Sequence, residues 1–231
     1  MPQLAALPKH MQISEGLIRD IQAGRLLDGE RLPPERTMAA DLGASVGTLR
    51  KALSALEEKG FLRRVQGSGN YVQAGKADTG IYAFFRLELP DSGGLPRAEL
   101  LDVRKTGKPD DLPDFGASND ATRIRRLRFL NNTPVAVEEI WLDAASGTLT
   151  AAQMSESLYR SYQTRLGLWV ARTEDRLHVA RFPDWTPAEL SPGGETAGYV
   201  ERMAWDTNGA AVEYSRTWFH GDRARYVQRM R

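Results

Sequence analysis

Apolar residues recur at helical spacing three times in the first sixty residues, and a glycine follows each segment. The predicted helices lie within residues 11–24, 33–43 and 45–60. Ser45 is a favourable helix cap, and only Ala44 separates it from the glycine that ends the preceding segment. Two helices joined by so short a turn form a helix-turn-helix. Residues 61–65 and 70–72 are β-prone and flank QGSG, which predicts a hairpin with glycines at its tip.

The pattern changes to alternating, β-prone runs in the second half of the chain. Two hairpins are expected, and the strands that form them are residues 125–130 with 135–142 and residues 199–205 with 211–220. Between the hairpins, residues 154–168 place apolar side chains at helical spacing, and a further short helix is expected near Pro187. These elements predict the α+β class with an antiparallel sheet.

The first turn of the third helix carries small or hydroxyl side chains at Ser45, Gly47 and Thr48. Such side chains let a helix N-terminus come close to a phosphate, which its free N–H groups attract. Arg50 follows and is able to reach a guanine edge with two hydrogen bonds. Helix pairs also occur in many α-helical proteins without DNA contacts, so the flanking side chains, not the helix pair, favour DNA binding.

The segment GERLPPERTMAADLGASVGTLRKALSALEEKGFLRRVQGSGNYV resembles the N-terminal domain of the GntR family of bacterial regulators, with the likeness covering residues 11–72. This resemblance implies a winged helix-turn-helix on double-stranded operator DNA. The positions that it implies in DNA contact are Arg36, Ser45, Val46, Gly47, Thr48, Arg50, Gln66 and Gly67.

Two positions depart from that family's pattern. Val46 stands where an arginine is usual, and Ser68 stands where the wing usually has a basic residue. Without these two cations, the slope of log DNA affinity against log salt should be less steep, by the contribution of about one to two neutralised phosphates. Val46 either packs on a thymine methyl group, which would shift base preference, or merely contacts a sugar.

The second half resembles the UTRA domain, the ligand-sensing domain of the HutC subgroup, from about residue 81 to residue 229. The residues that carry this likeness are RRLR at 125–128, SLY at 157–159 and VEYSRTWFHGDRARY at 212–226. The resemblance implies a chorismate-lyase-like fold and an effector site formed by Arg126, Arg128, Ser157, Tyr159 and Glu213. Phe219 replaces a tyrosine that is common in sugar-sensing members, and residues 82–94 also depart from the usual pattern.

The sequence itself supports the effector site only in part. Arg126 and Arg128 are two residues apart on a strand, so they point to one face and repel each other unless an acid or an anionic ligand lies between them. Glu138 or Glu139 on the partner strand, or solvent, would satisfy them equally well. The hydroxyl and carboxylate candidates also have ordinary alternatives as a helix cap, a core tyrosine and a cross-strand partner.

Length and composition fit a folded chain of two modest domains. We expect a DNA-binding domain at residues 1–73, a linker at 74–80, and an effector-binding and dimerisation domain at 81–231. Residues 1–75 hold ten Lys and Arg against eight Asp and Glu, a net charge of +2, and the rest of the chain carries −1. So small an excess does not by itself indicate a nucleic-acid partner.

Other classes of chemistry find little support. The chain has no cysteine and three histidines far apart in sequence, so we expect no metal and no cofactor. No apolar run is long enough to span a bilayer and no signal peptide is evident, so a cytoplasmic protein without a membrane partner is expected.

Three functions remain to be weighed. The favoured one is a homodimeric transcriptional regulator, most simply a repressor, that a small metabolite releases or modulates, and the two arginines favour an anionic one. In the second, the C-terminal domain only dimerises. The third is a lyase-like enzyme, for which the sequence offers no nucleophile–base pair, no metal-ligand spacing and no phosphate loop. The effector, the target genes, the operator sequence and the direction of regulation stay open.

Overall fold

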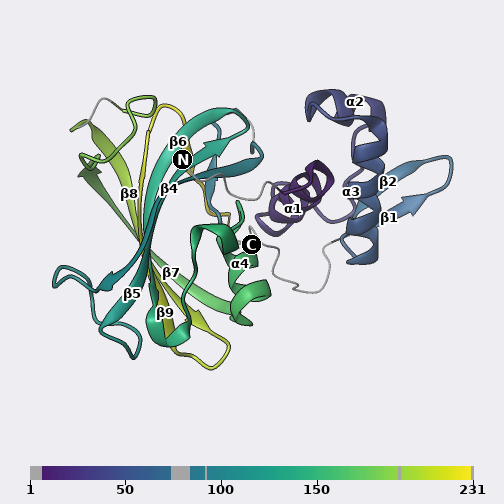
Figure 1. Cartoon of the computed structure of the whole chain (residues 1–231). Coiled ribbons are helices and arrows are strands. Elements are labelled where there is room, and N and C mark those ends of the chain that lie inside the picture. The colour runs from purple at the N-terminus through teal and green to yellow at the C-terminus, as the bar shows by residue number, and fades with distance from the viewer. Residues whose placement is uncertain (1–6, 74–83, 92, 192–193, 230–231) are drawn as a thin grey trace. The chain divides into compact units, whose positions relative to one another are not determined.

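The computed structural model describes residues 7–73, 84–91, 93–191 and 194–229 (Figure 1). The chain divides into two compact units. Of the described residues, one unit contains 7–73, 84–87, 93–96 and 226–229, and the other contains 88–91, 97–191 and 194–225. The predicted linker at residues 74–80 lies outside the described residues.

The N-terminal unit consists of three helices and a hairpin, as the sequence predicts (Figure 1). Its elements are α1 (Lys9–Gln22), α2 (Glu35–Asp41), α3 (Val46–Glu58), β1 (Leu62–Val65) and β2 (Gly69–Val72). Strands β1 and β2 are antiparallel, with Leu62 opposite Val72 and Val65 opposite Gly69. This arrangement is a winged helix-turn-helix.

Local chemistry explains where α3 begins and which face it buries. The Ser45 hydroxyl accepts a hydrogen bond from the Thr48 N–H at 3.1 Å, so it caps the helix as predicted. Leu49, Leu53 and Leu56 recur on one face and are fully buried in the core of this unit. Burial of three leucine side chains contributes roughly 5 kcal/mol or more before entropic costs are subtracted.

A short segment before the second unit packs on α1. Arg19 is buried and donates a hydrogen bond to the Gly94 carbonyl at 3.0 Å, while Asp20 lies 2.9 Å from the same guanidinium. Leu95 packs against the core, and a Cβ added at Gly16 would lie only 2.8 Å from its Cδ2 atom. Glycine at position 16 therefore permits this close approach, because any larger side chain would displace Leu95.

The C-terminal unit is built on an antiparallel six-stranded sheet, and the predicted α+β class is confirmed (Figure 1). Its strands, in the order in which they lie in the sheet, are β4 (Pro96–Gly107), β5 (Asp120–Leu130), β6 (Thr133–Asp143), β9 (Ala211–Phe219), β8 (Thr196–Asp206) and β7 (Val170–Arg181). Both predicted hairpins are present, as β5 with β6 and β8 with β9. Strands β4 and β7 were not predicted.

Shorter elements make up the rest of the regular structure among the described residues. They are β3 (Leu87–Glu88), which pairs with β10 (Arg225–Tyr226), the 3-10 turns η1 (Ala144–Ser146) and η2 (Ala151–Gln153), and α4 (Leu158–Ser161) with the π-helical turn η3 (Tyr162–Leu166). The predicted crossing helix is therefore present but shorter than its apolar spacing suggests. Gly167 ends it in the left-handed conformation, with φ of 64°.

The short helix expected near Pro187 was a wrong prediction. Residues 183–191 form hydrogen-bonded turns instead, in which the Leu190 N–H donates to the Pro187 carbonyl at 2.9 Å. Leu190 is buried in the core of the sheet unit. Pro183 and Pro187 have no backbone N–H to donate, and each accepts the hydrogen bond of a turn.

Strand register assigns the side chains to two faces of the sheet. Arg126 lies opposite Glu138, and Leu127 lies opposite Val137 on the other face. The face of Leu127 holds two buried apolar clusters, one around Trp218 and one around Trp141. The face of Arg126 carries the predicted effector residues of β5 and β9.

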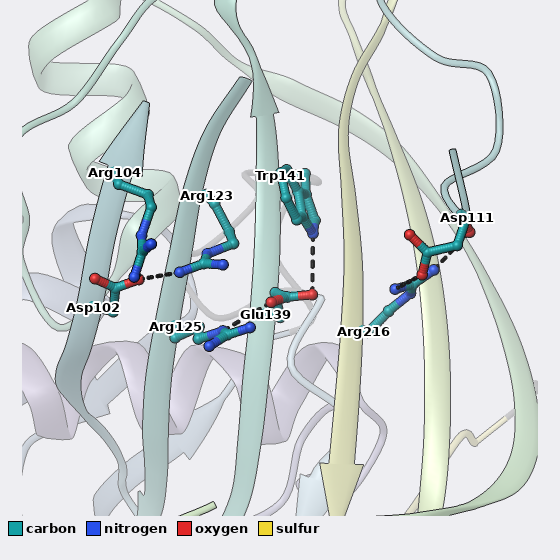
Figure 2. A network of polar contacts seen from close by, with 8 residues as sticks. All are labelled: Asp102, Arg104, Asp111, Arg123, Arg125, Glu139, Trp141 and Arg216. Atoms are coloured by element: carbon teal, nitrogen blue, oxygen red, sulfur yellow. Dashed lines mark hydrogen bonds and ion pairs between the residues drawn. The ribbon is translucent and has the colours of Figure 1, made fainter. Parts of the chain in front are cut away.

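Figure 2 shows a polar network that lies on the face of the apolar clusters. Glu139 accepts hydrogen bonds from Arg125 at 2.8 Å and from the Trp141 indole at 3.3 Å. Arg216 pairs with Asp111 at 2.8 Å, and Arg123 pairs with Asp102. Because its partners are on this face, Glu139 does not serve Arg126 or Arg128.

Candidate nucleic-acid interface and effector site

The predicted DNA-contacting residues lie on the surface of the N-terminal unit. Arg36, Ser45, Gly47, Arg50, Gln66 and Gly67 are exposed, and Val46 and Thr48 are half-buried. They come from the first turns of α2 and α3 and from the tip of the β1–β2 wing. At the start of α3, the first backbone N–H groups have no carbonyl of a preceding helical turn as acceptor. This end of the helix is therefore suited to an anion.

The hydroxyl groups at the start of α3 also stabilise the helix end. The Ser45 and Thr48 hydroxyl oxygens lie 2.8 Å apart and share a hydrogen bond, in addition to the capping bond. A phosphate that approaches α3 therefore meets two hydroxyls already ordered with respect to each other. This arrangement favours phosphate contact over base recognition at these two positions.

Val46 has a role that the sequence did not reveal. Its half-buried side chain packs against the core of the unit, together with Leu42 and Ala44 of the preceding turn. The usual arginine at this position would give up part of that apolar contact. Compared with an arginine, Val46 thus provides apolar packing under the turn and no positive charge.

Two basic side chains lie beside the wing, while its tip carries Ser68. Arg31 lies against Gly69, and the Arg63 guanidinium is 5.9 Å from the centre of the Tyr71 ring. The Ser68 hydroxyl, where a basic residue is usual, shares a hydrogen bond of 2.6 Å with the Tyr71 hydroxyl. Arg31 forms a backbone β-bridge with Tyr71 of β2. Because this pairing depends on the fold, only the structure identifies these neighbours.

In the C-terminal unit, Arg126 and Arg128 are buried and share one acid. Each guanidinium lies 3.0 Å from a different oxygen of Glu138. Burial alone would raise the pKa of Glu138, but the two guanidinium groups outweigh it and hold that pKa below the ordinary value. The two predicted arginines are thus brought together, and Glu138, one of the two acids that the sequence offered, lies between them.

Glu213 is buried on the same face of the sheet, where two tyrosines reach it. Its Oε2 accepts a hydrogen bond from the Tyr162 hydroxyl at 2.5 Å, and its Oε1 accepts one from Tyr159 at 3.2 Å. Burial raises the pKa of Glu213 despite these donors and the nearby Arg202. Helix α4 with η3 therefore places its tyrosine hydroxyls against β9.

Arg202 on β8 joins the two groups and was missed from the sequence. Its Nε and one terminal nitrogen donate to the two carboxylate oxygens of Asp175 on β7, at 2.6 Å each, in a two-bond ion pair. Its charge acts to lower the pKa of both acids, in agreement with the lowered pKa of Glu138 and against the burial that raises the pKa of Glu213. Sequence spacing could not find Arg202, because its place depends on pairing between β7, β8 and β9.

Ser157 and Phe219 complete the account of the predicted site. Ser157 is buried and its hydroxyl accepts from the Arg160 N–H at 3.4 Å, which is the ordinary role of a helix cap. Phe219 lies on the face of Arg128, and its ring covers Gly198, where any Cβ would clash with it. An apolar ring thus occupies the position where the resemblance would place a tyrosine hydroxyl in a sugar-sensing protein.

Among the described residues, no group of three or more acidic, histidine or cysteine side chains could hold a metal ion. Within the same part of the chain, no helix is both long and apolar enough to cross a membrane.

A winged helix-turn-helix with an exposed recognition-helix end, joined to a sheet unit that buries a charged cluster, defines a DNA-binding regulator with a sensor domain. The chain belongs to the gntR family of bacterial regulatory proteins, whose model matches residues 9–72, and the UTRA domain model matches residues 91–225. It is a transcriptional regulator of the HutC-like kind and not an enzyme.

Known proteins agree with this assignment. The HTH-type transcriptional regulator SmoD of Agrobacterium fabrum is 53% identical over 228 residues, covering 98% of this chain and 97% of that protein. The repressor NagR of Bacillus subtilis is 26% identical and covers 97% and 95% respectively. The crystal structure of YydK from Bacillus subtilis has a TM-score of 0.53 at 22% identity, covers 97% of this chain and 100% of that one, and shares the fold.

Proposed function

We propose that this regulator is a homodimeric repressor, released from a palindromic operator by a small anionic metabolite. The metabolite would bind on the sheet face formed by Arg126, Arg128, Ser157, Tyr159 and Glu213. Two relatives named as repressors, NagR of Bacillus subtilis and MngR of Escherichia coli, support the direction of regulation.

The observation that carries the proposal is the sharing of one carboxylate by two buried arginines. Arg126 and Arg128 carry two positive charges against the one negative charge of Glu138, so these three buried side chains attract a further anion. The buried Nε of Arg126 also has no hydrogen-bond partner among the described residues. A phosphate, sulfonate or carboxylate would neutralise the charge and accept that donor.

The proposed division of labour follows the predicted boundaries. We assign DNA binding to residues 1–73, connection to residues 74–80, and effector binding with dimerisation to residues 81–231. The dimer follows from DNA recognition by symmetry, because two copies present two α3 helices to the two halves of a palindrome.

The experiment is a mobility-shift titration on the gene's own upstream DNA, guided by a thermal-shift screen of phosphorylated, sulfonated and carboxylated metabolites. We expect one class of anion to raise the melting temperature and weaken the DNA complex. The variant R126A/R128A should keep DNA binding and lose both responses, whereas the exposed Arg104→Ala should keep them.

Two outcomes would contradict the proposal. If the double variant still released DNA with the same anion, the site would lie elsewhere. If every anion left both the wild-type protein and its DNA complex unchanged, the C-terminal unit would serve dimerisation alone, which is the second candidate function.

A further inference from the structure

We propose that Glu35 is a positioning residue for DNA recognition, which holds the Arg50 guanidinium in the orientation that reads a base pair. The inference rests on DNA binding by α3, and it assigns a role to a residue of α2. Glu35 is the first residue of α2 and Arg50 is the fifth residue of α3, so the contact joins the two helices of the helix-turn-helix.

The contact is short and uses one defined donor. The Arg50 Nε donates to the Glu35 Oε2 at 2.7 Å. The Arg50 side chain is nevertheless 65% exposed, while Glu35 is 25% exposed. The acid is therefore the fixed partner, and the end of the arginine remains accessible from outside.

Donation through Nε leaves the two terminal –NH₂ groups of the guanidinium for another acceptor. A guanidinium reads guanine by donating two hydrogen bonds to O6 and N7, and these two groups present such a pair of donors end-on. Without the carboxylate, the long arginine side chain would sample several rotamers and lose freedom on binding. Glu35 pre-orders the side chain before DNA arrives.

The charge of Glu35 adds selectivity. At long range the carboxylate cancels the charge of Arg50, and it repels phosphate oxygens. The ion pair therefore adds little attraction to the DNA backbone, and its contribution to binding depends on a matching base edge. Since Val46 replaces the cation usual beside it, Arg50 carries more of the discrimination at this end of α3. A surface ion pair of this kind is worth little to folding, which separates its recognition role from a structural one.

The test begins with full-length protein and a pool of random-sequence DNA duplexes. Enriched duplexes from the wild-type selection define the operator, and Arg50→Ala then identifies the base pair at which discrimination is lost. We expect Glu35→Gln to lower discrimination at that same base pair by about tenfold, a loss at the lower end for one bidentate base contact. Affinity for random DNA should not fall.

Two variants make the result specific. Glu58→Gln removes an exposed acid at the last residue of α3, and it should leave base preference at every position unchanged. Glu35→Asp retains the charge and should recover part of the discrimination. Thermal unfolding of each variant is measured alongside, and Glu35→Gln should melt within a few degrees of wild type.

The outcomes separate the possible failures. Unchanged discrimination in Glu35→Gln, or an equal loss of affinity for all duplexes with a lower melting temperature, would overturn the positioning role. Loss of preference at base pairs other than the one assigned to Arg50 would overturn it as well. Failure of the wild-type protein to enrich any sequence would instead contradict sequence-specific DNA binding itself.

Discussion

Asp143 is a buried carboxylate that organises the loop before β5. It accepts a hydrogen bond from the Lys108 ammonium group at 2.7 Å and others from the backbone N–H groups of Ala117 and Ser118. Burial alone would raise the pKa of Asp143, but these donors outweigh it and hold that pKa below its ordinary value. Gly116 is required beside it, because a Cβ there would clash with the carboxylate.

This arrangement predicts sensitivity to acid. A carboxylate whose pKa is lower in the folded state stabilises the fold above its unfolded pKa, near 4, and that stability is lost as the pH falls. Asp143→Asn should lower the free energy of unfolding at pH 7 by about 1–3 kcal/mol, because Lys108 loses its charged partner. Urea denaturation at pH 7 and at pH 4 measures both effects.

The variant's deficit should shrink at the lower pH, since the wild-type carboxylate begins to lose its advantage there. Asp120→Asn is the matched control, because Asp120 is 54% exposed and lies 3.9 Å from Lys105. An equal deficit at both pH values would show that Asp143 acts through packing and not through its charge.

Residues of the candidate site could be predicted only where they share a strand or a local turn. Arg126 and Arg128 follow from strand alternation, and Ser45 follows from its position before a helix. Arg202 and Asp175 could not be found in this way, because they meet only when β7 pairs with β8. The choice between Glu138 and Glu139 likewise needed the register of β5 against β6.

At the scale of elements, the sequence predicts those that combine a one-sided apolar pattern with clear end signals. Helices α1 to α3 and the two hairpins fit this description. Strand β7 was missed because both of its faces are largely exposed, including Leu177 and Val179, so apolar alternation is absent. The segment around Pro187 was wrongly predicted as a helix because a proline in a turn resembles the proline that often begins a helix.

Helix α3 offers a test of its atypical residue. Val46→Arg should tighten DNA binding and steepen the slope of log affinity against log salt by about one unit, because one more phosphate is neutralised. The loss of packing should lower stability slightly, since the valine is only half-buried. Fluorescence anisotropy on an operator duplex at several salt concentrations gives the slope.

Val46→Met serves as its control, because methionine lengthens the side chain without adding charge. It should leave the salt slope at the wild-type value. An arginine variant with an unchanged slope would mean that position 46 does not approach the DNA backbone.

At the scale of the whole molecule, the sheet ends in an unusually open strand. Strand β7 pairs only with β8 in the six-stranded sheet, and Leu177 and Val179 on it are 54% and 74% exposed. The outer backbone edge of such a strand is a ready surface for another strand, and the exposed apolar side chains on its face extend that surface. We expect a second copy of the chain to cover it in the proposed homodimer.

The charged double variant L177D/V179D should therefore weaken the dimer by tenfold or more, because carboxylates at an apolar contact are costly to desolvate. Sedimentation velocity over a range of protein concentrations reports the association constant. The double variant L177T/V179T keeps β propensity without charge and should have a smaller effect. A dimer unaffected by the aspartates would place the interface on another surface.

The buried charges on the sheet face also bear on how this fold will respond to selection. A buried cluster of ion pairs is often less stabilising than well-packed apolar side chains of similar size, and replacing such groups often raises stability. A laboratory search for heat-resistant variants alone should thus accumulate apolar substitutions around Glu138. On the function proposed for that face, such survivors would fold well and stay on their operator, unable to respond to the metabolite.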